Sequence, residues 1–135
     1  MGQSFEHHLA AVFDANRIHY TKGGKTERNN KPDFLFPGQA SYSDPTFPDG
    51  CLTMLAAKSV CKERWRQILP EADRIRAKHL VTLEPGISSA QTEQMQAHDV
   101  QLVVPHSLQA SYSKTQCEWL WSLDRFIGHV RELRD

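Results

Sequence analysis

The sequence lacks the features of a membrane-spanning, secreted or disulfide-linked protein. No apolar run approaches the roughly 20 residues that a transmembrane helix needs. The N-terminus also lacks the short apolar core of a signal peptide. The three cysteines, Cys51, Cys61 and Cys117, are an odd number with no close pairing, which argues against a disulfide framework and for a reducing compartment. We therefore expect a cytoplasmic protein that has no membrane partner.

Two further kinds of site are excluded because residues that they need are missing. Gly23-Gly24-Lys25-Thr26 resembles the end of a phosphate-binding loop, but the upstream glycine that this loop needs is missing. The seven histidines and the cysteines show no spacing that is typical of a structural zinc site. The sequence therefore predicts neither a nucleoside triphosphatase nor a zinc domain.

The length and charge of the chain leave a globular domain with one basic segment. With 135 residues, of which 39% are hydrophobic, the chain fits one domain that can bury a core of its own. The net charge is zero, but residues 58–78 carry 7 basic and 3 acidic side chains. Charge alone fits either a solvated helix face or a surface for nucleic acid.

Hydrophobic spacing predicts helices that alternate with strands. The expected strands are short apolar runs bounded by polar residues, at 18–21, 32–36, 51–58, 79–83 and 100–104. The expected helices cover about 4–16, a long stretch after residue 58 with a kink at Pro70, about 88–98, and the chain from 105 to its end. This alternation favours an α/β layered domain with a mixed sheet, in which the strands between residues 52 and 104 are mostly parallel.

Two charged residues in these strands and one in the following helix could form a nuclease site. Hydrolysis of a phosphodiester needs a metal held by carboxylates, and a nearby lysine can orient the attacking water. Asp33 lies in an apolar strand and Lys58 ends the next strong one, where charges are costly unless paired or metal-bound. A simple nuclease pattern has a carboxylate at position 56, but this sequence has Ala56, so Glu71 would supply the missing oxygen.

Each of these residues also has a structural explanation. A proline-aspartate pair such as Pro32-Asp33 is common, and a lysine at the end of a strand usually reaches solvent. Glu71, taken alone, fits an exposed helix position. The three side chains therefore do not establish a function by themselves.

Three longer segments resemble the catalytic domain of EcoRII-type restriction endonucleases, which cut at CC/GG-type sites. They are KPDFLFP at 31–37, LTMLAAK at 52–58 and CKERWRQIL at 61–69. The resemblance implies a three-layer α/β/α restriction-endonuclease-like core with a mixed sheet of about four to five strands, and Mg²⁺ as cofactor. In this subgroup the second carboxylate has moved to the helix, which accounts for Ala56. Asp33 and Glu71 would then hold the metal, and Lys58 would assist the attacking water.

The resemblance also assigns roles outside this triad. Glu6 matches a glutamate that can join the metal site, although a glutamate in a first helical turn is also favoured by the helix dipole. Tyr42 matches a tyrosine near the site, although tyrosines in loops often only pack. Lys62 and Arg64 match residues that read guanines, and arginine can pair bidentately with guanine in the major groove.

Four further residues of the basic segment are assigned from their chemistry. Arg66, Arg74 and Lys78 are candidates for contacts with DNA phosphates or for solubility. Trp65 is assigned to the core in preference to stacking on a base.

The resemblance implies a Mg²⁺-dependent type II restriction endonuclease acting on a CCWGG-like site. Its partners would be double-stranded DNA, a second copy of the chain, and a cognate DNA methyltransferase of the same system. Residues 1–135 would be a single catalytic core domain, without the upstream part of the family's catalytic domain and without an effector domain. The alternatives are a non-catalytic or truncated DNA-binding module that keeps the fold, and a repair or nicking nuclease of the same fold.

Overall fold

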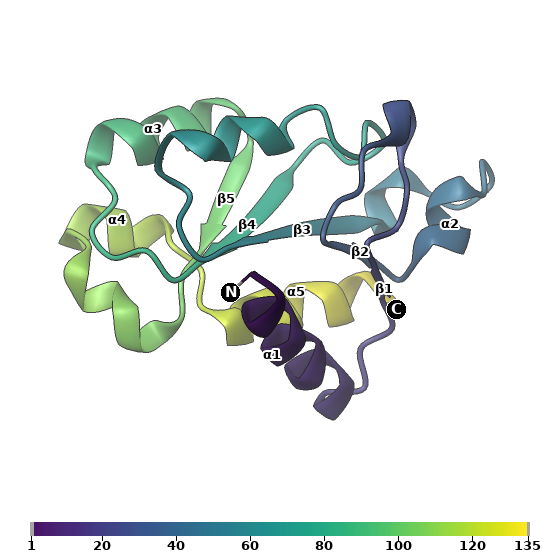
Figure 1. The fold of residues 1–135 in the computed structure, drawn as a ribbon, viewed down its shortest axis with the longest axis horizontal. Helices are drawn as coiled ribbons and strands as arrows, with labels where there is room; N and C mark the ends of the chain where they lie inside the picture. The colour runs from purple at the N-terminus through teal and green to yellow at the C-terminus, as the bar shows by residue number, and fades with distance from the viewer. Residues whose placement is uncertain (1, 135) are drawn as a thin grey trace.

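A computed structural model describes residues 2–134, except for the side chains of residues 2–4, 28, 62, 63 and 134. Within this range, a five-stranded mixed sheet lies between two layers of helices (Figure 1). The strands lie side by side in chain order: β1 (Thr21–Lys22), β2 (Phe34–Phe36), β3 (Thr53–Lys58), β4 (Lys78–Thr82) and β5 (Val100–Val103). β1, β2 and β3 pair antiparallel, whereas β3, β4 and β5 pair parallel. The predicted mixed α/β sheet is therefore confirmed.

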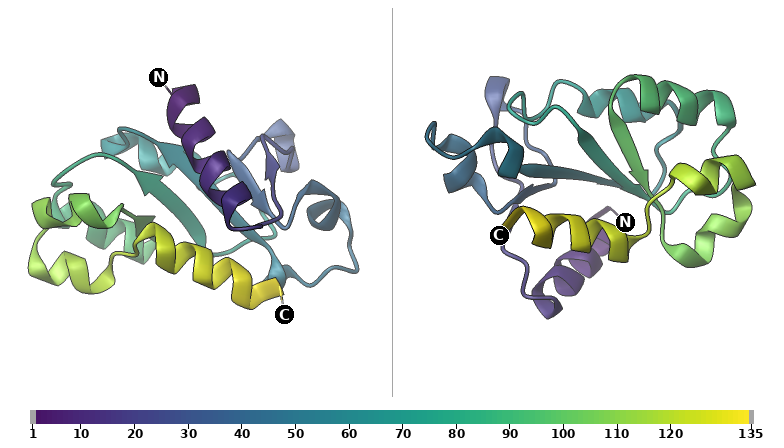
Figure 2. Two further views of the ribbon diagram at one scale, coloured as in Figure 1. Left: turned by 90° about the horizontal axis from the view of Figure 1, so that it is seen from below. Right: turned by 180° about the vertical axis from the view of Figure 1, so that it is seen from behind.

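Two long helices cover one face of the sheet. They are α1 (Gly2–Ala15) and α5 (Leu123–Arg134), which lie on the same side in both views of Figure 2. Phe5, Leu9 and Phe13 recur every four residues, so α1 presents one apolar stripe to the sheet. The Phe13 ring packs edge-on against Phe34 and Phe36 of β2, with centroids 5.2 and 5.3 Å apart.

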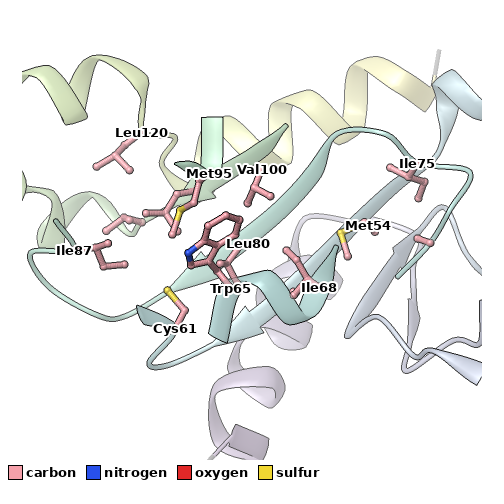
Figure 3. Packing of buried hydrophobic residues seen from close by; sticks show 14 of the residues in the cluster. Met54, Cys61, Trp65, Ile68, Ile75, Leu80, Ile87, Met95, Val100 and Leu120 are labelled. Atoms are coloured by element: carbon pink, nitrogen blue, oxygen red, sulfur yellow. The ribbon is translucent and has the colours of Figure 1, made fainter. Parts of the chain in front are cut away.

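The opposite face is covered by the 3₁₀ helix η3 (Lys62–Ile68) and α3 (Ser89–Ala97), while α4 (Lys114–Trp119) lies beside the sheet and packs side chains into the same core. Trp65 lies at the centre of this second core, among side chains that include Ile68, Leu80 and Met95 (Figure 3). The indole is 0% exposed, and its Nε1 donates a hydrogen bond to Gln91 Oε1 at 2.7 Å. Trp65 is thus a core residue, as predicted.

The long helix expected after β3 does not form. η3 ends at Ile68, and the Glu71 N–H turns back to the Ile68 carbonyl at 3.0 Å. Pro70 has no N–H to donate, and Ala72 has a φ of 54°, in the left-handed region, so neither residue can continue a helix. The apolar spacing was nevertheless a correct guide to burial, because Trp65, Ile68 and Ala72 all face the core.

Smaller elements also differ from the expected boundaries. The strand expected at 18–21 is the short β1, and the segment 37–50, expected to be irregular, contains α2 (Gln39–Ser43). The C-terminal helical region is divided into η4 (His106–Ser111), α4 and α5. The remaining 3₁₀ helices are η1 (Glu27–Asn29) and η2 (Asp49–Cys51). In the part of the chain that the structure describes, every helix is too short or too polar to cross a membrane.

His79 of β4 is a buried titratable group beneath α5. It is 4% exposed, and its ring lies against Trp121, Phe126 and His129 at centroid distances of 5.2–5.3 Å. Its Nδ1 has no hydrogen-bond partner among the described residues. Burial, together with the neighbouring His129, lowers the pKa of His79 to about 3, so the folded protein keeps this ring neutral.

We predict that His79→Phe reduces the loss of stability in acid. The unfolded chain protonates this histidine near the ordinary pKa of 6.5, whereas the folded chain does so only near pH 3. The neutral ring therefore stabilises the fold above pH 6.5, and this stabilisation is lost as the pH falls from 6.5 towards 3. Between pH 7 and 4.5 the free energy of unfolding should fall by ~2–3 kcal/mol more in the wild type than in the variant. Urea unfolding at both pH values measures this difference. The exposed His106→Phe is the control and should behave as the wild type. An equal loss in His79→Phe would contradict this assignment.

Candidate active site

Asp33 and Lys58 meet at one end of the sheet, because β2 and β3 run antiparallel. Phe34 pairs with Leu55, so the residue that precedes β2 lies beside the last residues of β3. The contact is direct: Oδ2 of Asp33 accepts a hydrogen bond from the Ala57 N–H at 2.7 Å. The Asp33 carboxylate is thereby fixed next to the strand end that carries Lys58.

The alternation of side chains along the strands puts these two residues on the same face. Leu35 and Ala56 belong to the core around Trp65. Asp33 lies two residues from Leu35, and Lys58 lies two residues from Ala56, so both share the face that η3 and α3 cover. Met54, two residues before Ala56, belongs to the same core and lies on this face as well.

Glu71 approaches from the turn that follows η3, on this same face. Its neighbours Ile68 and Ala72 are buried in the core around Trp65, which holds the turn against the sheet. Oε1 of Glu71 is buried and has no hydrogen-bond partner among the described residues. Burial, and secondarily the Asp33 charge, raises the pKa of Glu71 to about 7, while Lys58 and Lys78 act in the opposite direction. The structure therefore places Glu71 within electrostatic reach of Asp33 and Lys58, although on a turn and not on a helix.

Burial also shifts the pKa of the two other carboxylates, Asp33 and Glu6. Burial raises the pKa of Asp33, although the Ala57 N–H and the positive charges of Lys58 and Lys22 act to lower it. The pKa of Glu6 on α1 is also raised, first by burial and then by Asp33. Carboxylates that are buried together in this way favour a cation.

The donor set of this region fits a hard divalent cation. Asp33 and Glu71 offer carboxylate oxygens, the ligands that Mg²⁺ prefers, and the Glu71 Oε1 lacks any other partner in the described structure. No group of three His, Cys, Asp or Glu side chains is arranged to hold an ion within the described residues. Mg²⁺ typically uses one or two protein carboxylates and keeps other oxygen ligands, so two suffice.

The predicted DNA-binding residues lie on or next to η3. Arg64 is exposed and lines a cavity of about 930 Å³, together with Val60, Glu84 and Gln91. Arg66 is exposed as well, but its guanidinium lies 4.5 Å above the Trp65 ring centroid and donates to Gln94 of α3. The side chain of Lys62 lies outside the described residues.

Two basic residues were expected to contact phosphates or to confer solubility, and this expectation is wrong. Their side chains instead donate to backbone carbonyls of the chain itself. Lys78 is 6% exposed, and its Nζ donates to the carbonyls of Ala72, at 2.8 Å, and Ile75. Arg74 forms an ion pair with Asp49 at 2.7 Å. The Arg74 guanidinium also donates to backbone carbonyls of the segment around α2, at Ser41, Tyr42, Asp44 and Phe47.

Tyr42 contacts the segment that follows Glu71, through Arg74 and Glu27. Its hydroxyl donates to Glu27 Oε1 at 2.6 Å and accepts the Arg74 N–H at 3.1 Å, and burial raises its pKa. Sequence reasoning missed Glu27, because a glutamate in a polar loop carries no local signal of such a contact. It also missed Glu84, whose Oε1 accepts the Cys61 N–H at 2.7 Å, although its position just after a buried strand was visible.

Comparison with known proteins gives matches to a family, to a curated relative and to solved structures. The family described as EcoRII C terminal matches residues 1–127. The chain is 45% identical over 133 residues to the type II restriction enzyme EcoRII of Escherichia coli, covering 98% of this chain and 33% of that enzyme. The chain therefore spans about a third of the length of this relative.

Two solved structures share the fold. Both are of metal-depleted Ecl18kI, one with uncleaved, modified DNA and one with uncleaved DNA, at TM-scores of 0.83 and 0.81. Each is 20% identical and covers 98% of this chain and 44% of that chain. At this identity the likeness concerns the fold, and it confirms the restriction-endonuclease-like α/β/α core.

We predict that Arg74→Ala destabilises the protein. Truncation removes the ion pair and leaves partly buried carbonyls around α2 without a donor, which should lower the free energy of unfolding by about 2–3 kcal/mol. Arg76→Ala is the matched control, because its ion pair with Asp99 is solvent-exposed and should contribute less than about 1 kcal/mol. Urea unfolding measures both variants. If the two variants were equally stable, Arg74 would be an ordinary surface cation and the prediction would be contradicted.

Proposed function

This chain belongs to the EcoRII C-terminal family, and from that premise we propose that it is the catalytic core of a Mg²⁺-dependent type II restriction endonuclease. Residues 1–135 act as one domain that hydrolyses phosphodiester bonds of double-stranded DNA at a short CC/GG-type site, CCWGG-like. The observation that supports this most directly is the buried Oε1 of Glu71, which has no hydrogen-bond partner among the described residues and lies within electrostatic reach of Asp33 and Lys58.

The three residues divide two tasks in the proposed reaction, holding the cation and orienting the attacking water. Asp33 and Glu71 hold the cation; the Ala57 N–H fixes one oxygen of Asp33, so that the other can act as a ligand. Lys58 binds and orients the attacking water and balances charge that develops on the phosphate. When bound, the cation lowers the pKa of water and neutralises the phosphate oxygens. Glu6 supports the site from α1, and Tyr42 supports it through Glu27 and Arg74.

Recognition of the site is assigned to η3. Arg64 is exposed next to the cavity that begins at the end of β3, where an arginine can reach a guanine edge. Lys62 joins it in this proposal, and Arg66 contacts a phosphate. A symmetric site is matched by two copies of the chain related by a twofold axis. The enzyme would work in the cytoplasm beside a DNA methyltransferase that protects the same sites.

We predict that Asp33→Asn and Lys58→Met each slow cleavage at least about a hundredfold. The first variant removes the ligand charge but keeps an oxygen for the Ala57 N–H, and the second removes the ammonium but keeps its stem. The assay is cleavage of supercoiled plasmid with Mg²⁺, with sequencing of the product ends and circular dichroism as a check of folding. Lys114→Met, at the exposed start of α4, is the control.

These outcomes separate the candidate functions. Cleavage by either variant at the wild-type rate would rule out the site. A wild-type protein that binds duplexes with Mg²⁺ but never cuts them would instead indicate a DNA-binding module that keeps the fold. Single-strand breaks, or a requirement for damaged DNA, would indicate a nicking or repair nuclease.

We predict that Arg64→Ala relaxes sequence preference. Loss of a bidentate base contact should weaken binding to a CC/GG-type duplex by ~1–3 kcal/mol and leave random duplexes nearly unchanged. Arg66→Ala, as a phosphate contact, should weaken both equally and reduce the salt dependence. Fluorescence anisotropy in Ca²⁺ at several salt concentrations measures these effects. Equal losses on both duplexes for Arg64→Ala would remove it from base recognition.

A further inference from the structure

The turn that carries Glu71 is held by side chains from the polar loop between β1 and β2. Asn30 Nδ2 donates to the Pro70 carbonyl at 3.1 Å. Thr26 Oγ1 accepts the Ala72 N–H at 3.1 Å, and Glu27 Oε1 accepts the Asp73 N–H at 3.1 Å. Backbone groups on both sides of Glu71 are thus bound by side chains that lie 40 to 46 positions earlier in the chain.

Ala72 explains why the turn needs this support. With a φ of 54° it has a backbone conformation that costs a non-glycine residue roughly 1–3 kcal/mol, and it directly follows Glu71. It is 0% exposed, so its polar groups need protein partners. Thr26 binds the N–H and Lys78 binds the carbonyl, so both polar groups of this strained residue are held by side chains.

The loop itself is fixed before it reaches the turn. Gln39 of α2 binds the backbone of Lys25 twice: its Oε1 accepts the Lys25 N–H at 2.9 Å, and its Nε2 donates to the Lys25 carbonyl at 3.0 Å. Gly24 allows the close approach, because an added Cβ would lie 3.0 Å from Leu35 Cδ1 and 3.2 Å from Gln39 Oε1. The Gly24-Lys25-Thr26 sequence, which is not a phosphate loop, thus has a structural task.

We propose that Thr26, Glu27 and Asn30 form a clamp that positions Glu71 as a ligand for the cation. This inference rests on the proposed function. Without the Thr26 hydroxyl, Ala72 relaxes toward an unstrained conformation and carries the adjacent Glu71 carboxylate away from Asp33. The clamp residues touch neither the cation nor the DNA; they act through the backbone of the turn, as outer-shell groups do in metal sites.

The test compares two variants of Thr26 in the full chain. Thr26→Val keeps the shape of the side chain but cannot accept the Ala72 N–H, whereas Thr26→Ser keeps the hydroxyl. Mn²⁺ binding is measured without DNA from the loss of the free-ion signal in electron paramagnetic resonance. We expect the Mn²⁺ dissociation constant to rise about tenfold in Thr26→Val and to stay within about twofold in Thr26→Ser.

A control separates positioning from plain stability. Thr92 is a buried threonine in α3 whose Oγ1 donates to the Ser89 carbonyl and accepts from Gln116. Thr92→Val should lower the melting temperature but leave Mn²⁺ affinity at the wild-type value. Asn30→Ala, on the partly exposed edge of the clamp, should cause a smaller loss of Mn²⁺ affinity. This variant replaces Thr26→Val in the test if Thr26→Val does not fold.

The outcomes for the clamp and for the proposed function are distinct. If Thr26→Val and Asn30→Ala bind Mn²⁺ as tightly as the wild type does, while Asp33→Asn does not bind it, the clamp alone would be overturned. Wild-type protein that binds no Mn²⁺ would overturn the metal site itself. Cleavage by Thr26→Val that recovers at high Mn²⁺ concentration would support the clamp, because only an affinity defect is restored by more ion.

Discussion

The burial of the Glu71 carboxylate is the constraint on which the arrangement of the site depends. A buried carboxylate oxygen that lacks a hydrogen-bond partner, as Oε1 of Glu71 does among the described residues, is costly, and here a second carboxylate, Asp33, adds its negative charge. The raised pKa of Glu71 expresses this cost, which Lys58 only partly offsets. The fold keeps the group in place through Ala72, itself strained. Strain and unpaired polar atoms gathered at one point are typical of a site that is completed by a ligand.

The parts of the site that lie on strands could be predicted from the sequence. Asp33 and Lys58 interrupt apolar runs, and alternation along a strand determines the face on which each lies. The pairing of β2 with β3 could not be derived in the same way, because it is a contact between distant segments. The structure supplies it through Phe34 and Leu55, and through the bond from Ala57 to Asp33.

The segment after β3 is where sequence reasoning failed on conformation but succeeded on burial. Apolar residues at Trp65, Ile68 and Ala72 fit a helix, yet a 3₁₀ turn followed by a bend buries the same positions. Pro70 was visible as a break. The left-handed Ala72 was not, because it depends on Thr26 and Lys78, which lie elsewhere in the chain. The basic charge of this segment was misleading for a similar reason: Arg74 and Lys78 turn inward to backbone carbonyls.

The short η3 connects the proposed recognition and the proposed chemistry. Lys58 ends β3, Arg64 lies on η3, and Glu71 follows on the next turn, so one continuous segment carries all three. This segment is anchored at its start, where Glu84 accepts the Cys61 N–H, and in its middle, where Trp65 is buried and bound to Gln91. A long helix would place Arg64 and Glu71 on one side, two turns apart. The bend at Pro70 and Ala72 instead turns Glu71 back to the sheet while Arg64 stays exposed. In the proposed function, the residues that recognise DNA and those that cut it are therefore only a few positions apart on this one segment.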